Sequence, residues 1–241
     1  MRYFRSTVQM ICAATMLSTL VGCAKFPSTP ATTGRQLVLT MTVRGRISPT
    51  DTEDPSIRRY YYIAIDNDND QYTGPWAVVY PPFGGNGWVT SKDAAHSIGM
   101  TSFIEYDVAN PTGYIYGVQP GSFFLNTTSP EVPIRVELLD GGATLRFTID
   151  LSQVATTLIP ADQIRQLDIN FITTDALAVD PNNHYTGRQW DALGPSGQNY
   201  VTIDTTSDRT YYGGEEDTQT TPDPDLDIVY WSAQVQTVAS R

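Results

Sequence analysis

The sequence predicts an all-β protein: a single-domain antiparallel β-sandwich of two sheets, jelly-roll or immunoglobulin-like. Only 17% of the 241 residues are charged, whereas Tyr, Thr, Gly, Pro and Asn are plentiful, a composition that favours strands and turns over helices. Short runs of alternating apolar and polar residues recur along the chain, and no convincing amphipathic helix interrupts them. With 40% hydrophobic residues the chain can bury one core of the larger all-β kind.

The expected strands follow one another with short turns between them. Leu37, Leu39, Met41 and Val43 alternate with polar or smaller residues, which is the period of a half-buried strand. The pattern indicates roughly nine strands, at residues 35–44, 59–66, 76–80, 100–107, 114–118, 132–139, 144–149, 167–173 and 226–238. One short helical turn each is expected within residues 151–158 and 161–166.

The segment from Thr174 to Asp225 is expected to be mostly polar loop, interrupted near Tyr200 to Ile203. Six carboxylates lie between Gly213 and Asp227, and their density favours a solvated acidic excursion. The formal net charge of the whole chain is -11. So acidic a protein repels phosphate backbones, which argues against a nucleic-acid partner.

The N-terminus has the features of an export signal. Arg2 and Arg5 precede an apolar stretch that is too short to span a bilayer comfortably, and the stretch ends in Leu20-Val21-Gly22-Cys23. This tetrapeptide resembles the lipobox of bacterial lipoproteins. The resemblance implies export, cleavage before Cys23, lipidation of Cys23, and anchoring to a bacterial membrane. The alternative is an ordinary signal peptide that ends near a cysteine.

These features divide the chain into a signal peptide at 1–22, a lipidated Cys23 with a flexible tether to residue 34, and a β-sandwich at 35–241. Ala24 after the lipidated cysteine favours the outer membrane in a Gram-negative host, by the family's sorting habit. Cys12 lies in the signal peptide, so no disulfide is expected in the mature chain.

A carboxylate-rich loop follows the aromatic strand at 59–66. Asp66, Asp68 and Asp70 occupy alternate positions, and hard oxygen ligands at this spacing suit Ca²⁺, which takes roughly six to eight oxygens. The loop is not an EF-hand, because Gln71 and Ala77 stand where that motif needs Gly and Glu. The alternative is a turn in which the aspartates accept nearby backbone N–H groups.

The same region resembles a known group of domains. Tyr-Tyr-Ile-Ala-Ile-Asp-Asn-Asp at 61–68, followed by Tyr-Thr-Gly at 72–74, is similar to the aromatic strand and Asp-rich turn of family 9 carbohydrate-binding modules and DOMON-like sandwiches. Phe147 to Val154 resembles their later segment. The resemblance implies a β-sandwich, bound Ca²⁺ and, in some relatives, a sugar held between Trp side chains. It does not assign those Trp roles to particular residues here.

Aromatic residues near the loops are the candidate ligand contacts. Trp76, Trp88 and Trp190 lie in or beside predicted loops, and aromatic faces stack on the C–H faces of pyranose rings. Trp88, beside Gly87, is the best candidate; the alternative for each is a core or corner position. Trp231, in the last strand, is expected in the core. Haem is not expected, since the two histidines lack a convincing Met partner.

The residue patterns favour a non-catalytic protein. No Gly-x-Ser-x-Gly or His-Glu-x-x-His motif occurs, and Glu105 and Glu137 fit outward, solvated strand positions. The leading prediction is therefore an envelope lipoprotein that binds a glycan or another envelope component, with calcium as a candidate supporting ion. The alternatives are a structural or assembly lipoprotein that contacts envelope proteins and, third, a glycan hydrolase with two carboxylates in a cleft.

Overall fold

The computed structural model describes residues 34–51, 53–72, 74–75, 77, 99–118, 129–175, 189–194, 199–215 and 221–238. They belong to one compact unit, Thr32–Arg241. The expected signal peptide, Cys23, most of the tether, Trp76 and the rest of the strand expected at 76–80 apart from Ala77, and Trp88 lie outside the described residues. Within the described ranges, no helix has the length and hydropathy needed to span a bilayer.

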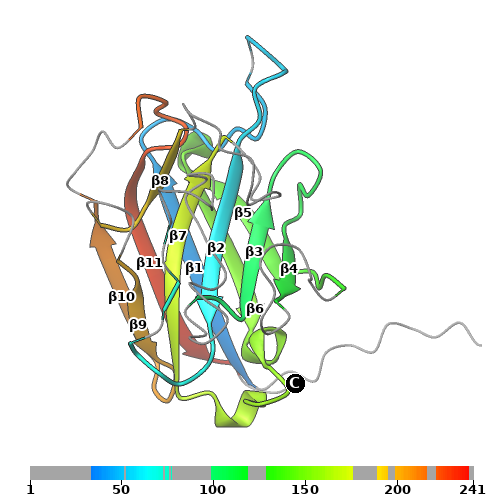
Figure 1. The fold of residues 1–241 in the computed structure, drawn as a ribbon, viewed down its shortest axis with the longest axis vertical. Helices are drawn as coiled ribbons and strands as arrows, with labels where there is room; N and C mark the ends of the chain where they lie inside the picture. The colour runs from blue at the N-terminus through cyan, green and yellow to red at the C-terminus, as the bar shows by residue number, and fades with distance from the viewer. Residues whose placement is uncertain are drawn as a thin grey trace, which may run out of the picture. The chain divides into compact units, whose positions relative to one another are not determined.

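The protein is an antiparallel β-sandwich, as the sequence predicts. The first sheet has five strands in the order β10-β11-β1-β6-β5 (Figure 1). Their bounds are β1 Arg35–Val43, β5 Arg135–Leu139, β6 Thr144–Asp150, β10 Arg209–Gly214 and β11 Ile228–Thr237. The first and last strands of the described chain are therefore neighbours, and Arg35 pairs with Thr237.

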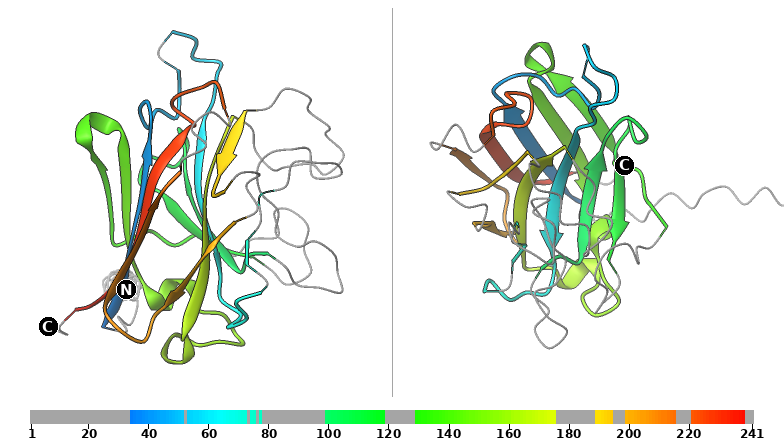
Figure 2. Two further views of the ribbon diagram at one scale, coloured as in Figure 1. Left: turned by 90° about the vertical axis from the view of Figure 1, so that its left-hand side faces the viewer. Right: turned by 45° about the horizontal axis from the view of Figure 1, so that its top comes forward.

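The second sheet packs against the first, and the two layers are seen edge-on in Figure 2. Its strand order is β4-β3-β2-β7-β8, with β9 also paired to β7. The bounds are β2 Tyr60–Asp66, β3 Ser102–Tyr106, β4 Tyr114–Gly117, β7 Gln166–Thr174, β8 Trp190–Ala192 and β9 Val201–Asp204.

Side chains alternate between the two faces of each strand, and those on the inner faces form the core between the sheets. Leu37, Leu39 and Met41 of β1 are fully buried and belong to one cluster with Ile63 of β2 and Phe171 of β7. Burying a side chain of this size contributes about 1.5–3 kcal/mol. Trp231 packs against the same cluster and stacks on Phe171, with ring centroids 5.9 Å apart, which confirms its predicted core position.

Short 3-10 helices turn the chain between strands. Leu151–Val154 and Ala161–Gln163 confirm the two helical turns expected from the sequence. The first begins with a capping box in which the Asp150 carboxylate accepts the Ser152 N–H and Gln153 Oε1 accepts the Asp150 N–H. Between β5 and β6 the chain reverses in a tight turn at Asp140–Gly142, whose three residues all have positive φ.

The later part of the chain contains more strand than expected, and one expectation there is wrong. Strands β8 and β10 lie within the segment expected to be mostly loop: β8 pairs with β7, and the Tyr- and Thr-containing β10 pairs with β11 despite its polar composition. The acidic segment is not a solvated excursion at Asp223, Asp225 and Asp227. Asp227 is 1% exposed and forms an ion pair with Arg44 at 2.8 Å. Ion pairs with arginines far away in the sequence therefore hold these carboxylates against the folded domain.

Candidate functional site

The outer face of the second sheet carries a group of aromatic side chains. Since alternate residues of a strand point to opposite sides, Ile63 and Ile104 face the core while their neighbours face outward. We call the outward group the aromatic face: Tyr60, Tyr62, Phe103, Tyr114, Tyr116 and Trp190. In Figure 1, β2, β3 and β7 lie on the viewer's side of the first sheet.

The rings of the aromatic face contact one another across strands. Tyr60 and Tyr62 lie nearly parallel with centroids 6.3 Å apart, and Phe103 and Tyr116 stack at 5.1 Å. Tyr62 and Phe103 are buried, whereas Tyr60, Tyr114, Tyr116 and Trp190 are half-buried. Buried rings thus support partly exposed ones, which an added ligand can contact.

Glu105 lies at the centre of this face. It is the cross-strand partner of Tyr62 on β2 and of Tyr114 on β4. The Tyr62 hydroxyl donates a hydrogen bond to Glu105 Oε1 at 3.4 Å. Burial, with the nearby charge of Asp107, raises the pKa of Glu105 to about 7, and the bond from Tyr62 lowers it in part.

The predicted solvated role of Glu105 is therefore wrong, since the carboxylate is half-buried among aromatic rings. The sequence carried a usable signal. Phe103 and Glu105 alternate with Ile104, so a carboxylate and an aromatic ring share one face of that strand. What the sequence alone did not supply was the pairing that brings Tyr62 and Tyr114 to either side.

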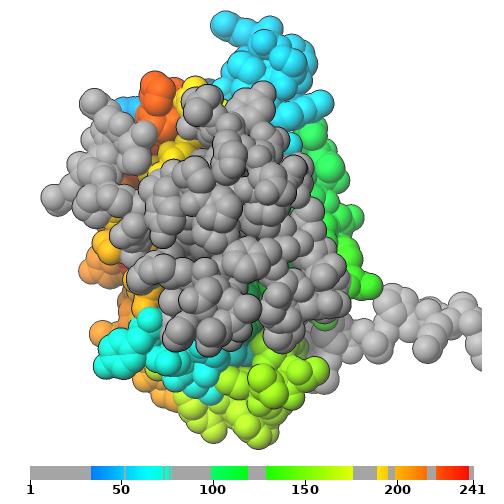
Figure 3. Space-filling view, viewed as in Figure 1, coloured from blue at the N-terminus to red at the C-terminus, as the bar shows by residue number. Residues whose placement is uncertain are grey.

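The acidic loop after β2 uses two of its aspartates in turns. Asp68 Oδ1 accepts the Asp70 N–H at 2.7 Å, and Asp70 Oδ1 accepts the Tyr72 N–H at 3.0 Å. Asn69 between them has a φ of 61°, a left-handed conformation that Asn tolerates. The loop is exposed at the surface, in cyan beside residues 150–165 in Figure 3. This is the turn geometry that the sequence left open as the alternative to a calcium loop.

Asp66 has a different environment from Asp68 and Asp70. It ends β2, is only 3% exposed, and pairs across the sheet with Asp168 of β7, which accepts a hydrogen bond from Thr202 Oγ1. Within the part of the chain that the structure describes, Asp66 Oδ2 has no hydrogen-bond partner. Burial first, and then the charges of Asp68 and Asp168, raise the pKa of Asp66 to about 9. Burial also raises the pKa of Asp168 to about 6.

Among the described residues, no group of three or more His, Cys, Asp or Glu side chains is arranged to hold a metal ion. The buried pair of Asp66 and Asp168 is nevertheless chemically suited to a cation, because an orphaned carboxylate oxygen lies beside a second carboxylate. The residues that would hold Ca²⁺ are thus Asp66 and Asp168, with Asp68 and Asp70 close enough to affect the charge of the pair.

Trp190, the predicted ligand residue that the structure describes, lies away from the predicted metal residues. Strands β2 and β7 are antiparallel, so Asp66 pairs with Asp168 at one end while Tyr60 pairs with Thr174 at the other. Trp190 is the partner of Thr174 on β8 and therefore lies at the Tyr60 end. Trp190 packs against the cluster that contains Tyr60 and Tyr62, and so it joins the aromatic face.

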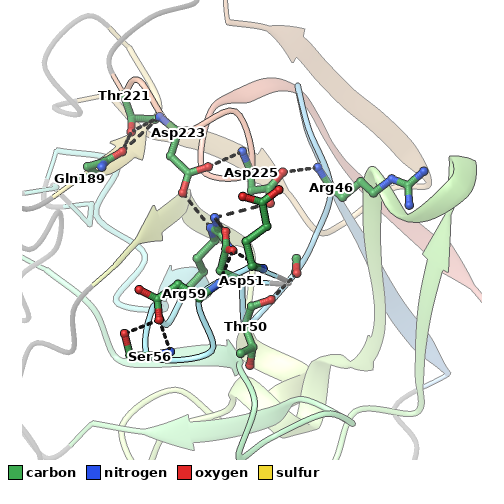
Figure 4. Close-up of polar contacts among 12 residues, drawn as sticks. Arg46, Thr50, Asp51, Ser56, Arg59, Gln189, Thr221, Asp223 and Asp225 are labelled. Carbon is green, nitrogen blue, oxygen red and sulfur yellow. Dashed lines mark hydrogen bonds and ion pairs between the residues drawn. The ribbon is translucent and has the colours of Figure 1, made fainter.

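A second polar cluster surrounds Arg59 (Figure 4). Its guanidinium donates to Asp51 Oδ2 and to Asp223 Oδ2, each at 2.7 Å, and lies 3.7 Å from Asp225 Oδ2. Arg59 is 4% exposed. Asp225 in turn accepts the Arg46 N–H at 2.8 Å. The cluster ties segments from three parts of the chain together, which is a structural role.

Comparison of the chain with protein-family models, with curated proteins and with solved structures gives no match. Its function is therefore inferred from the residues described above. The aromatic face offers stacking surfaces and one carboxylate acceptor, a combination suited to binding a ring-shaped polar ligand.

Proposed function

We propose that the chain is a lipid-anchored lipoprotein of the bacterial envelope whose β-sandwich binds a glycan or another envelope component without catalysing a reaction. The observation that carries the binding role is the aromatic face around Glu105. Partly exposed tyrosine rings stack on the C–H face of a sugar, and a carboxylate accepts hydrogen bonds from sugar hydroxyls. Trp190 extends this face toward β8.

The anchoring role depends on Leu20-Val21-Gly22-Cys23 and the basic, apolar segment before it. Each buried acyl methylene contributes about 0.8 kcal/mol, so a multiply acylated cysteine holds a protein firmly at a bilayer. A Cys23→Ser variant should leave the membrane fraction. Its recovery from membranes in unchanged yield would contradict the anchor.

Calcium is a supporting element of the proposal. The ion would be held by Asp66 and Asp168, where it would offset the charge of a carboxylate oxygen that no hydrogen bond stabilises. Its effect would be to stabilise the loop after β2, since Trp190 and Tyr60 lie at the opposite end of the sheet.

A glycan-array screen of the soluble domain tests the binding role. The variant Tyr114→Ala removes a half-buried ring of the aromatic face, and Tyr212→Ala removes a tyrosine that is 69% exposed on β10 of the other sheet. We expect sugar-dependent signals for the wild type and for Tyr212→Ala, and weakened signals for Tyr114→Ala. No sugar-dependent signal from the wild type would count against glycan binding.

One observation supports a second function, protein contact within an envelope assembly. Strand β5 is an edge of the first sheet, and apolar side chains on and before it are exposed: Val132 56%, Ile134 49% and Leu138 47%. Exposed apolar edges invite pairing with another chain. Cross-linking in intact cells with a photoreactive residue at 138 would capture such a partner. The absence of any cross-linked protein would remove this second function.

A further inference from the structure

We propose that the aromatic face is selective for a saccharide that carries ammonium groups, with Glu105 and the rings of Tyr60, Tyr114 and Tyr116 contacting the amino sugar. This inference rests on the proposed function and names the chemical class of its ligand.

The first argument is the charge of the sheet. The six strands of the second sheet contain no Lys, Arg or His, whereas Asp66, Glu105 and Asp168 occupy outward positions on them; Asp191 points into the sandwich, where it accepts the Ile228 N–H. Strands of the first sheet, in contrast, carry Arg35, Arg135, Arg146 and Arg209. The outer face of the second sheet is thus complementary to a cation.

The second argument is the environment of Glu105. Among the residues that the structure describes, the charged or titratable groups around it are Asp107, Tyr60, Tyr62, Tyr114 and Tyr116. The charge of Arg58 acts on Tyr60, and its guanidinium donates a hydrogen bond to Thr50 Oγ1 at 3.1 Å. A half-buried carboxylate whose hydrogen bond from a phenol is weak is stabilised most by an ion pair with a cation.

The third argument is the arrangement of rings. A cation within about 6 Å of a tyrosine ring centroid is attracted to its face. Neighbouring centroids of the aromatic face are 5.1–6.3 Å apart, so an ammonium group near Glu105 has a ring on both flanking strands. Because the rings spread over three strands, they suit a chain of sugar rings better than one isolated amine.

Titration calorimetry with three hexasaccharides tests the inference on the soluble domain. The probes are β-1,4-linked glucosamine, its N-acetylated counterpart and a neutral glucose hexamer, which share a backbone and differ at the second carbon. We expect the glucosamine hexamer to bind at least about tenfold more tightly than either neutral probe, a difference of about 1.4 kcal/mol.

Two variants locate the effect. Glu105→Gln keeps the shape and one acceptor oxygen but removes the charge, so the affinity for the glucosamine hexamer should fall to that for the neutral probes. Glu137→Gln on β5, where Glu137 forms an ion pair with Arg135 at 2.9 Å, is the matched control and should keep the preference. Thermal melts establish that both variants are folded.

The outcomes separate the inference from the proposed function. Equal binding of all three probes, or a preference that persists in Glu105→Gln, would overturn ammonium selectivity while leaving glycan binding intact. No binding of any probe, together with a silent glycan array, would overturn both.

Discussion

Asp66 and Asp168 are direct cross-strand partners on β2 and β7, and both are almost fully buried at 3% and 2% exposure. Burial is the main cause that raises the pKa of Asp66 to about 9 and that of Asp168 to about 6, and the charges of Asp68 and Asp168 raise the pKa of Asp66 further. Their titration makes the stability of the domain depend on pH.

The sign of this dependence follows from the direction of the shifts. Both carboxyls hold their protons more tightly in the folded chain than in the unfolded one. Their contribution to the free energy of unfolding is therefore greatest below about pH 4 and falls as the pH rises toward 9. In chelator, Asp66→Asn should raise stability at pH 8 by about 1–3 kcal/mol and flatten the profile. Urea melts across this range measure it. A lower stability for Asp66→Asn at pH 8 would contradict the assignment.

Calcium should reverse the effect of that substitution. At millimolar Ca²⁺ and a Kd on the order of 10⁻⁴–10⁻³ M, binding stabilises by about 0.4–1.4 kcal/mol. The melting temperature of the wild type should then rise by about 1–5 °C, while that of Asp66→Asn should not. Asp162→Asn, in the 3-10 helix Ala161–Gln163, is a control that should respond as the wild type does. Identical wild-type melts in Ca²⁺ and in chelator would remove calcium from the proposal.

Arg59 should be essential to the stability of the cluster in Figure 4. Arg59→Met leaves Asp51 and Asp223 without their guanidinium partner, and breaking such a buried pair costs about 3–5 kcal/mol. Arg59→Lys should recover only part of this, since one ammonium cannot reproduce the fork of donors. Exposed Arg58→Met is the control. Denaturant melts of equal midpoint for Arg59→Met and Arg58→Met would refute the structural role.

Alanine substitutions at two glycines with similar φ angles distinguish the effect of a steric clash from that of backbone strain. Gly113 and Gly141 have φ of 67° and 69°. A Cβ at Gly113 would lie 2.6 Å from Phe147 Cε1, whereas a Cβ at Gly141 meets nothing within 4 Å. Both alanine variants carry the strain of positive φ, about 1 kcal/mol, and Gly113→Ala should lose about 1–3 kcal/mol more from overpacking. Similar melting temperatures for the two variants would contradict the packing around Phe147.

The strands with strong apolar alternation could be predicted from the sequence, and β1, β2 and the hairpin of β5 and β6 lie close to their expected positions. Strand β10 could not, because Arg-Thr-Tyr-Tyr-Gly-Gly becomes a strand through its pairing with β11. Carboxylate roles were the least predictable. Asp68 accepts a turn N–H, one of the two roles that the sequence left open, whereas Glu105 lies among rings brought together by three strands, which its own strand pattern did not reveal.

The central claim is that the aromatic face binds a glycan, and the most direct test is the affinity of the strongest array ligand for Tyr114→Ala compared with Tyr212→Ala. Calorimetry should show about a tenfold loss for Tyr114→Ala, about 1.4 kcal/mol, and an affinity within about twofold of wild type for Tyr212→Ala. Equal affinities for the two variants would contradict the claim.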